Sequence, residues 1–284
     1  MNAIASAFVA ACRDELQAPK PGNVHVHAAG HRMTVADFEA SAAAAAEPLC
    51  APGARVGARI RGAVAATRRA VGTNTNLGIV LLCAPLAAAA GPGGHGRLRD
   101  RLAGVLADLD VADAADAFAA IVEASPAGLG RAESHDVFGP AQVTLVEAMA
   151  TAADRDRVAR QYATGFADVF DLGMPAHAAA AARRHPPEYA TLAVYLAFLS
   201  GFSDSHIVRK HGEAAGREVT RTARKFEALL KETADPAVLL PALLAWDRRL
   251  KENGLNPGTS ADLTVAASFA IRLQSVLPSA LIFD

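Results

Sequence analysis

The stretch LKENGLNPGTSADLTVAASFA, Leu250 to Ala270, places a polar Asn-Pro-Gly-Thr-Ser-Ala-Asp corner between two helical patterns. Apolar residues on both sides of the corner recur mostly at intervals of three and four, which is the spacing of one face of an α-helix. The same spacing recurs along the chain, and alternation of polar residues with β-branched or aromatic ones is nearly absent. The sequence therefore predicts an all-α protein.

Helix-start signals sharpen this prediction. Thr34 opens an apolar run and Asp37 follows three residues later, which predicts a capping box, and Asp110 opens another run in the same style. Abundant alanine lets helix axes approach closely, so we expect a compact bundle that forms one domain over residues 1–284. We expect about twelve helices, with ends placed to within about 2–4 residues, at 3–17, 35–49, 55–71, 77–90, 97–107, 111–124, 139–151, 155–171, 187–202, 205–231, 236–251 and 260–275.

The composition excludes several kinds of protein. The 284 residues are 52% hydrophobic, enough for a sizeable core, and the net charge of −1 creates no field that would recruit nucleic acid or an anionic membrane. The N-terminal stretch suits an amphipathic helix better than a signal peptide, and the longest apolar run, Ile79 to Ala90, is shorter than the ~20 residues that span a bilayer. Cys12, Cys50 and Cys83 match no zinc or redox spacing. We expect a soluble cytoplasmic protein, whose alanine-rich helices could also form a homodimer seam.

The first polar segment is KPGNVHVHAAGH, Lys20 to His31. Lys20 and the backbone N–H groups that follow the Pro-Gly turn could face an anion, although an ordinary loop with solvated histidines explains the same residues. His25, His27 and His31 have no acidic or cysteine partner at a familiar ligand spacing, so they do not indicate structural zinc.

The second polar segment, GTNTNLG, leads into an apolar helix. Asn74, Thr75 and Asn76 with the exposed amides of a helix start would suit an anion or a ribose hydroxyl. Capping by Thr75 or Asn76 alone is the simpler explanation, but it requires only one of these residues.

The third segment, SGFSDSHIVRKHG, follows another apolar helix. Asp204, Arg209 and Lys210 could together hold a metal ion and phosphates. An N-cap aspartate that leads a solvated basic helix face is the alternative.

The corner at the start of this section is the fourth segment, with Asn256, Ser260 and Asp262. Local capping of the last helix explains Ser260 and Asp262 without any function.

A fifth cluster, ESHDVFGP, carries Glu133, His135 and Asp136. These groups suit acid-base chemistry, but exposed loops also contain them by chance. The common nucleotide and hydrolase signatures are absent from the sequence.

Taken in order, five of these motifs resemble those of the triphosphoribosyl-dephospho-CoA synthase family: KPGNV, His-x-Met with DFxxS after it, TNTNLG, SDSHIVRKHG and LNPGTSADL. The resemblance covers nearly the whole chain. It implies an all-α enzyme that uses ATP and Mg²⁺ and displaces adenine from C1′ of the ATP ribose. The nucleophile is the ribose 2′-hydroxyl of 3′-dephospho-CoA, and the product is the precursor of the prosthetic group of citrate or malonate decarboxylase acyl carriers.

Such a reaction needs a carboxylate near C1′, a base for the incoming hydroxyl and cations for the triphosphate. With the resemblance, Asp204 and Asp262 become the catalytic and metal candidates, and His31 becomes the base with Asp37 behind it. The candidates for substrate and phosphate binding are Lys20, Asn23, Asn74, Thr75, Asn76, Arg209, Lys210, Asn256 and Ser260.

Two motifs depart from the family pattern and keep other functions open. NTNLG stands where members typically read NTHKG, and His31-Arg32-Met33 lacks the aspartate of the family's H-x-D-M. The alternatives are phosphoribosyl transfer from ATP or phosphoribosyl pyrophosphate to another cofactor precursor, such as a methanopterin-type one-carbon carrier. Hydrolysis of an N-glycosidic bond and non-catalytic nucleotide binding also remain open.

Overall fold

The computed structural model describes residues 1–30, 33–93, 95–125, 130–131 and 134–277. These residues form α-helices, one π-helix and one 3-10 helix and contain no strand, so the all-α prediction is confirmed. The elements in chain order are α1 (Ala3–Gln17), α2 (Val35–Leu49), α3 (Val56–Val71), α4 (Leu77–Ala89), α5 (Leu98–Ala107), α6 (Val111–Ala124), α7 (Leu145–Ala150), α8 (Arg157–Thr164), η1 (Asp168–Gly173), α9 (Met174–Ala182), α10 (Pro187–Gly201), α11 (Ser205–His211), α12 (Glu213–Glu232), η2 (Pro236–Leu239), α13 (Leu240–Glu252) and α14 (Gly258–Val276).

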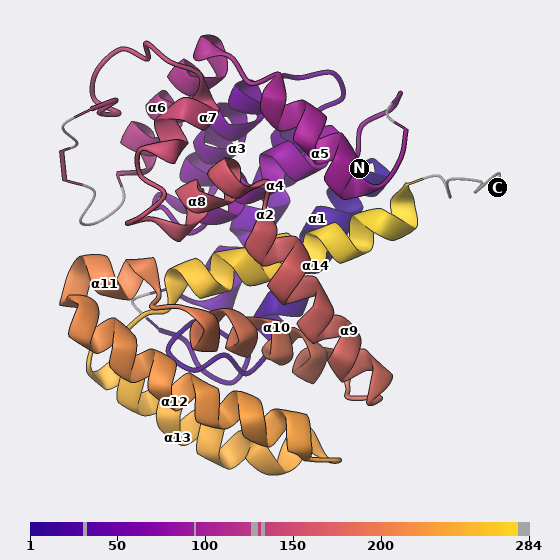
Figure 1. The fold of residues 1–284 in the computed structure, drawn as a ribbon, viewed down its shortest axis with the longest axis vertical. Helices are drawn as coiled ribbons and strands as arrows, with labels where there is room; N and C mark the ends of the chain where they lie inside the picture. Colours follow the sequence, from indigo (N-terminus) through magenta and orange to yellow (C-terminus); the bar gives the residue numbers. More distant parts are fainter. Residues whose placement is uncertain (31–32, 94, 126–129, 132–133, 278–284) are drawn as a thin grey trace.

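The last helix, α14, runs through the middle of the molecule (Figure 1). It contacts α1 and α4 as well as α10, so it joins the first and last parts of the chain. Its side chains are buried nearly all the way round, as expected for a helix without a polar face. Above it in Figure 1 lie α3, α6 and α7, and below it lie α12 and α13.

Two predicted helix starts are confirmed, whereas one predicted helix is divided in the structure. Thr34 with Asp37 and Asp110 with Asp113 form capping boxes. The helix expected at 205–231 is two helices, because Gly212 takes φ +83° and ψ 168° between them.

Further boundaries also differ from those expected. The helix expected at 155–171 ends at Gly165, whose φ is +62°, and is followed by the π-helix η1. The helix α9 was not expected at all, although its run of alanines is a strong helix former.

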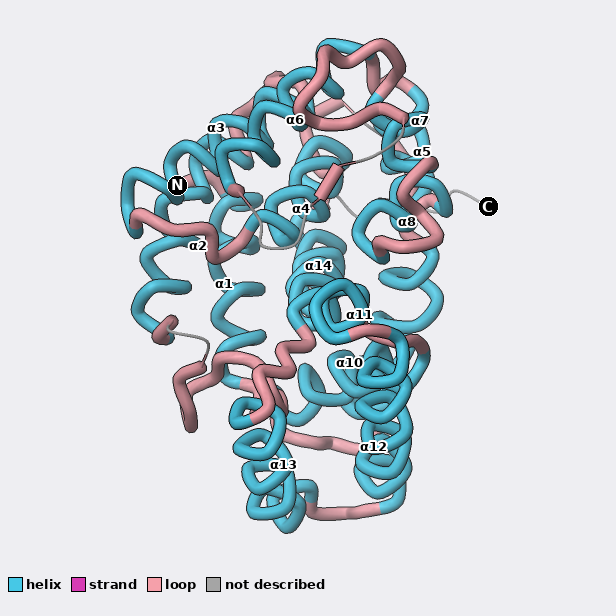
Figure 2. The backbone as a smooth tube through the Cα atoms, turned by 90° about the vertical axis from the view of Figure 1, so that its left-hand side faces the viewer, coloured by secondary structure: helices cyan, strands magenta, loops and turns pink. Residues whose placement is uncertain are grey.

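The two Pro-Gly corners lie against each other, as the backbone trace in Figure 2 allows the reader to follow between α1 and the start of α14. Gly22 has a φ of +85°, and a Cβ there would lie 2.8 Å from Pro257 Cδ, so neither the conformation nor the space suits another residue. The Asn23 side-chain amide donates to Asn256 Oδ1 over 2.9 Å. Packing between the corners therefore fixes where α14 begins.

The remaining features of the fold are the apolar helices and the cysteines. No single helix within the described residues is long and apolar enough to cross a bilayer, and only the pair α10 and α11, bent by 49°, passes that test on length and composition. Cys12, Cys50 and Cys83 are buried free thiols.

Candidate active site

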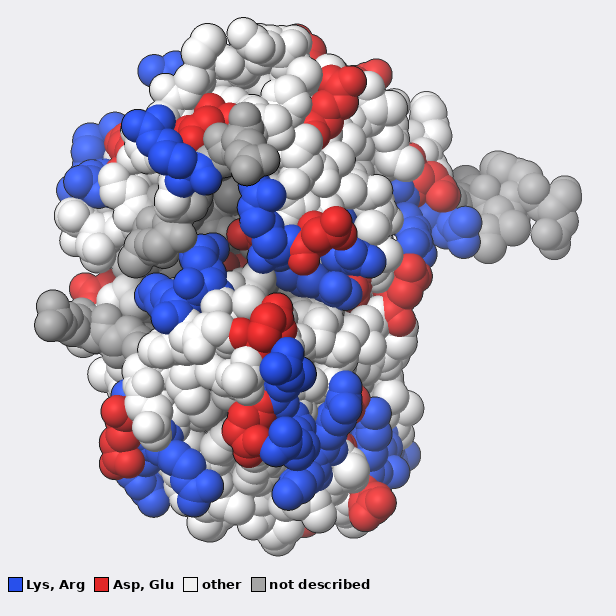
Figure 3. All heavy atoms as spheres, turned by 60° about the vertical axis from the view of Figure 1, so that its left-hand side comes forward, with Lys and Arg blue, Asp and Glu red and all other residues white. Residues whose placement is uncertain are grey.

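One cavity of about 850 Å³ opens where the starts of α4, α11 and α14 meet the end of α1. Seven of the candidate site residues line it: Asn23, Asn74, Thr75, Arg209, Lys210, Asn256 and Asp262. His135 and Asp136 of the fifth cluster also line it, and Glu133 lies outside the described residues. Figure 3 shows the corresponding face, where lysine and arginine side chains gather around a hollow. A volume of this size is typical of small-molecule sites.

His31 lies outside the described residues. Five other candidates do not line the cavity. Four of them are buried, namely Lys20, Asn76, Asp204 and Ser260, whereas Asp37 is partly exposed at the start of α2.

Asp262 is the carboxylate that faces the cavity from α14. The helix begins at Gly258 rather than at the expected residue 260, so Asp262 lies beyond the first turn and caps nothing. The Asp262 carboxylate forms no hydrogen bond and no ion pair with any described residue. A Cβ on Gly78 would overlap Asp262 Oδ2, so the carboxylate packs directly on the first turn of α4. Local capping, which the sequence alone favoured for Asp262, does not explain this side chain.

The surroundings of Asp262 disfavour its charge. Burial raises the pKa of its carboxyl well above the ordinary value, and the negative charges of Glu15, Asp204 and Asp156 add to the rise. Arg209 acts in the opposite direction. A cation that entered the cavity could therefore pair with the Asp262 carboxylate, which has no ion pair among the described residues.

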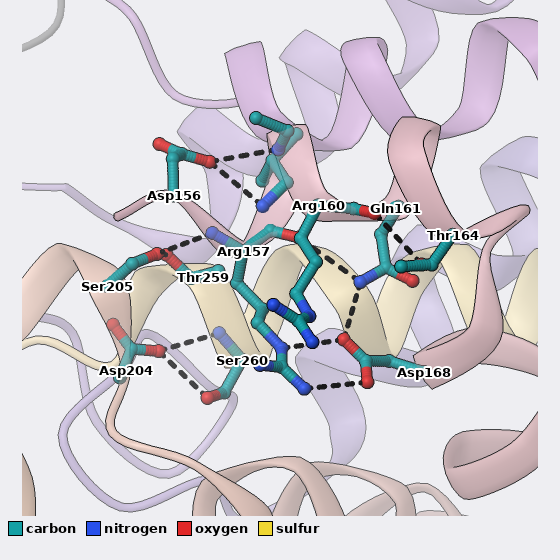
Figure 4. A network of polar contacts seen from close by, with 12 residues as sticks. Asp156, Arg157, Arg160, Gln161, Thr164, Asp168, Asp204, Ser205, Thr259 and Ser260 are labelled. Carbon is teal, nitrogen blue, oxygen red and sulfur yellow. Dashed lines mark hydrogen bonds and ion pairs between the residues drawn. The ribbon is translucent and has the colours of Figure 1, made fainter. Parts of the chain in front are cut away.

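Asp204 has the opposite environment, shown in Figure 4. Its Oδ1 accepts hydrogen bonds from the backbone N–H groups of His206 (2.9 Å) and Ile207 (3.2 Å), which makes it the N-cap of α11. Its Oδ2 accepts from the backbone N–H and the hydroxyl of Ser260, at 2.7 and 2.8 Å. Burial raises the pKa of Asp204, and these hydrogen bonds oppose the rise. The side chain joins the starts of α11 and α14 and has little capacity left for a ligand.

A second set of polar contacts in Figure 4 continues this joint toward α8. The hydroxyls of Ser205 and Thr259 lie 2.9 Å apart, and the backbone N–H of Arg157 donates to Ser205 Oγ. The Arg157 guanidinium forms two hydrogen bonds with Asp168, at 2.7 and 2.9 Å, and lies 4.0 Å above the Phe202 ring. These contacts hold four elements together. Ser205 and Thr259 belong to sequence motifs, whereas no motif indicated Arg157 or Asp168.

The polar residues before α4 are all engaged in the wall of the cavity. Asn74 Oδ1 accepts from the backbone N–H of Leu77, so Asn74 makes the local cap that the sequence assigned to Thr75 or Asn76. Thr75 donates to the Ser41 hydroxyl over 2.6 Å, and the Asn76 amide donates to Thr67 over 3.1 Å. Asn74 and Thr75 still line the cavity, whereas Asn76 is buried behind it.

Lys20 and Asp37 have partners inside the protein. The Lys20 ammonium is fully buried, 2.9 Å from Glu15 Oε1 and 2.5 Å from the Val24 carbonyl oxygen. It is therefore not the mobile cation that the loop sequence predicted. Asp37 Oδ2 accepts from the backbone N–H and hydroxyl of Thr34 in the capping box.

Several cavity residues were not among the candidates. Glu15 belongs to the last turn of α1, and Arg68 to the last turn of α3. Arg155 and Asp156 precede α8, where the sequence predicted the start of a longer helix. Asp156 Oδ2 lies 3.6 Å from Arg209 Nη1. None stands in a Pro-Gly corner, and only their position at helix ends could have pointed to them.

The comparison with known proteins decides the family. A family model described as ATP:dephospho-CoA triphosphoribosyl transferase matches residues 1–279. The chain belongs to this family. It is therefore a transferase of the ATP:dephospho-CoA triphosphoribosyl type, as the five motifs indicated.

The fold has a solved relative. A protein from Archaeoglobus fulgidus, provisionally named as a triphosphoribosyl-dephospho-CoA synthase, matches with a TM-score of 0.62 and 24% sequence identity over 81% of this chain and 96% of that chain. At this identity the match shows a shared fold. No curated protein matches the chain.

Proposed function

We propose that the cavity is the site where the family reaction takes place, with ATP as the donor of the triphosphoribosyl group and 3′-dephospho-CoA as its acceptor. The observation that supports this most is the position of Asp262, a carboxylate without a partner among the described residues, in a cavity that also holds Arg209 and Lys210. A reaction that builds positive charge at a ribose C1′ beside a triphosphate needs both features.

The role of Asp262 follows from its surroundings. As the bond between C1′ and adenine breaks, C1′ acquires oxocarbenium-like positive charge. In water such charge is solvated, whereas here the carboxylate of Asp262 would stabilise it at short range in a less polar medium. This interaction is stronger with the positively charged transition state than with neutral ribose. Burial and the charge of Glu15 disfavour the ionised form of Asp262, so a positive partner is the group that Asp262 lacks.

The triphosphate would bind to the basic side of the cavity. Arg209 and Lys210 project from α11 and Arg155 from the loop before α8, and all three line the cavity. One guanidinium group can donate two hydrogen bonds to two oxygens of the same phosphate, so Arg155 and Arg209 are suited to bind the triphosphate. Lys20 is excluded from this role because its ammonium is committed to Glu15.

Polar groups of the two corners would serve the ribose and the acceptor. The side chains that line the cavity there are Asn23, Asn74, Thr75 and Asn256. The remaining candidates Asn76, Asp204 and Ser260 support the walls through their hydrogen bonds with each other or with neighbours.

The donor set fits Mg²⁺ held jointly with ATP. The described residues contain no group of three or more His, Cys, Asp or Glu side chains that could hold a metal alone. Mg²⁺ commonly takes one or two carboxylates and completes its shell with phosphate oxygens and water. Asp156 lines the cavity and would hold the ion together with the phosphates, and the ion would neutralise phosphate charge. Asp262 would then remain available for C1′, and Asp204 is already hydrogen-bonded.

Two wider predictions accompany this assignment. We infer that residues 1–284 act as one domain, since α14 contacts both α1 and α10. A cytoplasmic location and a homodimer stay predictions from the sequence.

The test is release of adenine. Purified protein is incubated with Mg²⁺, ATP and 3′-dephospho-CoA, and adenine and the coupled product are measured by chromatography and mass spectrometry. We expect adenine only when both substrates are present, in a 1:1 ratio to product. Adenine without acceptor would indicate a hydrolase, and turnover only with phosphoribosyl pyrophosphate or another acceptor would reject the assignment.

A variant pair tests the phosphate site. Arg209→Gln should raise the KM for ATP by about 10-fold or more, because a charge-assisted contact with phosphate is lost. Arg217→Gln removes an exposed arginine of the neighbouring helix α12 and should leave KM unchanged.

A further inference from the structure

Glu15 is a second carboxylate of the cavity that the assignment above does not use. It belongs to the last turn of α1, its side chain is 5% exposed, and it lines the cavity. Among the described residues, the Glu15 side chain pairs only with Lys20. Lys20 belongs to the buried loop that follows α1. A buried carboxylate beside a reaction centre needs a reason, because burying a charge is costly.

We propose that Glu15 is the general base of the transfer reaction and that Lys20 is the residue that positions it. This inference rests on the proposed function, since it concerns the hydroxyl that attacks C1′.

The first argument is position. Glu15 and Asp262 line the same cavity, and the negative charge of Glu15 contributes to the raised pKa of the Asp262 carboxyl. The helices that carry them, α1 and α14, pack against each other. A reacting ribose beside Asp262 would therefore lie within the field of Glu15 also. Displacement at a sugar carbon commonly uses two carboxylates. Here one would stabilise positive charge at C1′ and the other would remove the proton of the attacking hydroxyl.

The second argument is the difference between the two carboxylates. Glu15 has a cation at 2.9 Å, whereas Asp262 has no ion pair among the described residues. Burial raises the pKa of Glu15, and Lys20 opposes the rise. Lys20 favours the ionised form of Glu15 while burial makes the carboxylate more basic than an exposed glutamate, which is the combination a general base needs.

The third argument is the way Lys20 is held. Burial lowers the pKa of its ammonium, and Glu15 opposes the fall. Its second partner is the carbonyl oxygen of Val24, four residues later in the same loop. The loop is fixed in turn by Asp247, whose Oδ1 accepts from the backbone N–H of Gly22 over 2.8 Å. Among the described residues, Glu15 is the one carboxylate that forms an ion pair with the Lys20 ammonium.

The chemical step balances without another reactant. The acceptor hydroxyl oxygen forms a bond to C1′ and gives its proton to the Glu15 carboxylate. The bond between C1′ and the adenine nitrogen breaks, and its electron pair leaves with adenine. Adenine takes one proton from water as it departs, and Glu15 returns its proton to solvent. The net proton transfer is from the hydroxyl to adenine.

The experiment uses the full chain with Mg²⁺, ATP and 3′-dephospho-CoA. For Glu15→Gln we expect kcat to fall about 10²–10⁴-fold, the range of a general base. The KM of both substrates should stay within about threefold, because the base acts mainly in the transition state. The matched control is Glu47→Gln, an exposed carboxylate on α2 with the same change of group. It should keep wild-type kcat.

Lys20→Met tests the positioning role. Without the ammonium the pKa of Glu15 should rise, so the acidic limb of the kcat/KM profile should move to higher pH. A purely structural lysine would lower the melting temperature without moving that limb. The matched control is Lys225→Met, an exposed lysine on α12, which should change neither.

Glu15→Gln also leaves Lys20 without its counter-ion, so the double variant Glu15→Gln/Lys20→Met separates folding from chemistry. It removes both buried charges, and we expect it to melt above Lys20→Met but to turn over as slowly as Glu15→Gln. Turnover within about tenfold of wild type in either folded variant that lacks Glu15 would overturn the inference. If the wild type releases no adenine at all, the proposed function fails instead.

Discussion

Asp204 is buried before α11 and Asp262 is partly buried in the cavity wall on α14, yet the structure treats the two carboxylates in opposite ways. Asp204 accepts four hydrogen bonds and joins α11 to α14. Asp262 accepts none from the described residues and is opposed by three other carboxylates. A buried carboxylate that is fully hydrogen-bonded stabilises a fold, whereas one without partners is a cost that function can explain. The two aspartates should therefore respond differently to the same chemical change.

The largest effect is expected on turnover in Asp262→Asn. The amide fills the same space but cannot stabilise positive charge at C1′, so kcat should fall about 10³-fold. The melting temperature should stay the same or rise, because the variant removes a charge that Glu15 and burial disfavour. Adenine release and thermal denaturation measure the two quantities. A variant with normal turnover would remove Asp262 from the reaction centre.

The mirror-image result is expected in Asp204→Asn. An amide can still cap α11, but its NH₂ group would face the N–H and hydroxyl donors of Ser260, so unfolding should become easier by about 2–4 kcal/mol. Turnover per folded molecule should change much less than in Asp262→Asn. Chemical denaturation measures the stability. Asp235→Asn, an exposed N-cap with one hydrogen bond to Ala237, is the matched control and should cost less than about 0.5 kcal/mol.

Gly78→Ala should sharpen the comparison from the other side of the cavity. A Cβ there would overlap Asp262 Oδ2, so the carboxylate must move, and misplacement by about 1 Å can cost up to about 100-fold in kcat. The interior of α5 offers the control Gly104→Ala, where a Cβ meets nothing within 4 Å. That variant should gain about 0.5–1 kcal/mol of stability from helix propensity and keep its activity. Equal kcat in both variants would contradict the placement of Asp262.

The sequence predicted the fold well because its information is local. Apolar spacing and capping residues determine helices over a few turns, and the starts at Thr34 and Asp110 were found correctly. Breaks that depend on one backbone conformation were harder. The pattern of residues 205–231 continues across Gly212, and only its positive φ divides the helix.

The site was harder to predict because its information is not local. The motifs drew attention to the right segments, and seven of the thirteen candidate site residues line the cavity. They could not show that Lys20 points to Glu15 rather than to a phosphate, since that contact depends on the packing of the loop against α13. Nor could they separate Asp204 from Asp262, since both follow helix-start patterns and differ only in which partners the fold provides.

The smallest expected effect is the pH dependence of stability, measured without Mg²⁺ or nucleotide. Because the pKa of Asp262 is raised in the folded state, the folded protein keeps this proton at pH values where the unfolded chain has lost it. The contribution of Asp262 to stability therefore declines as pH rises from the ordinary aspartate pKa toward the raised one. Asp262→Asn lacks this contribution, so its advantage over the wild type should grow with pH, by less than about 1.4 kcal/mol per pH unit, and then level off.

The difference between wild type and variant removes the contributions of titrating groups that do not interact with Asp262. Glu15 and Asp204 act on Asp262, so the difference reports Asp262 together with its coupling to these two carboxylates. Asp204→Asn would not give the same clean difference, because it also breaks the joint with Ser260. A stability difference between wild type and Asp262→Asn that stays flat from pH 4 to pH 8 would mean that Asp262 is as well solvated as an exposed aspartate. The contrast with Asp204 would then lie in geometry alone.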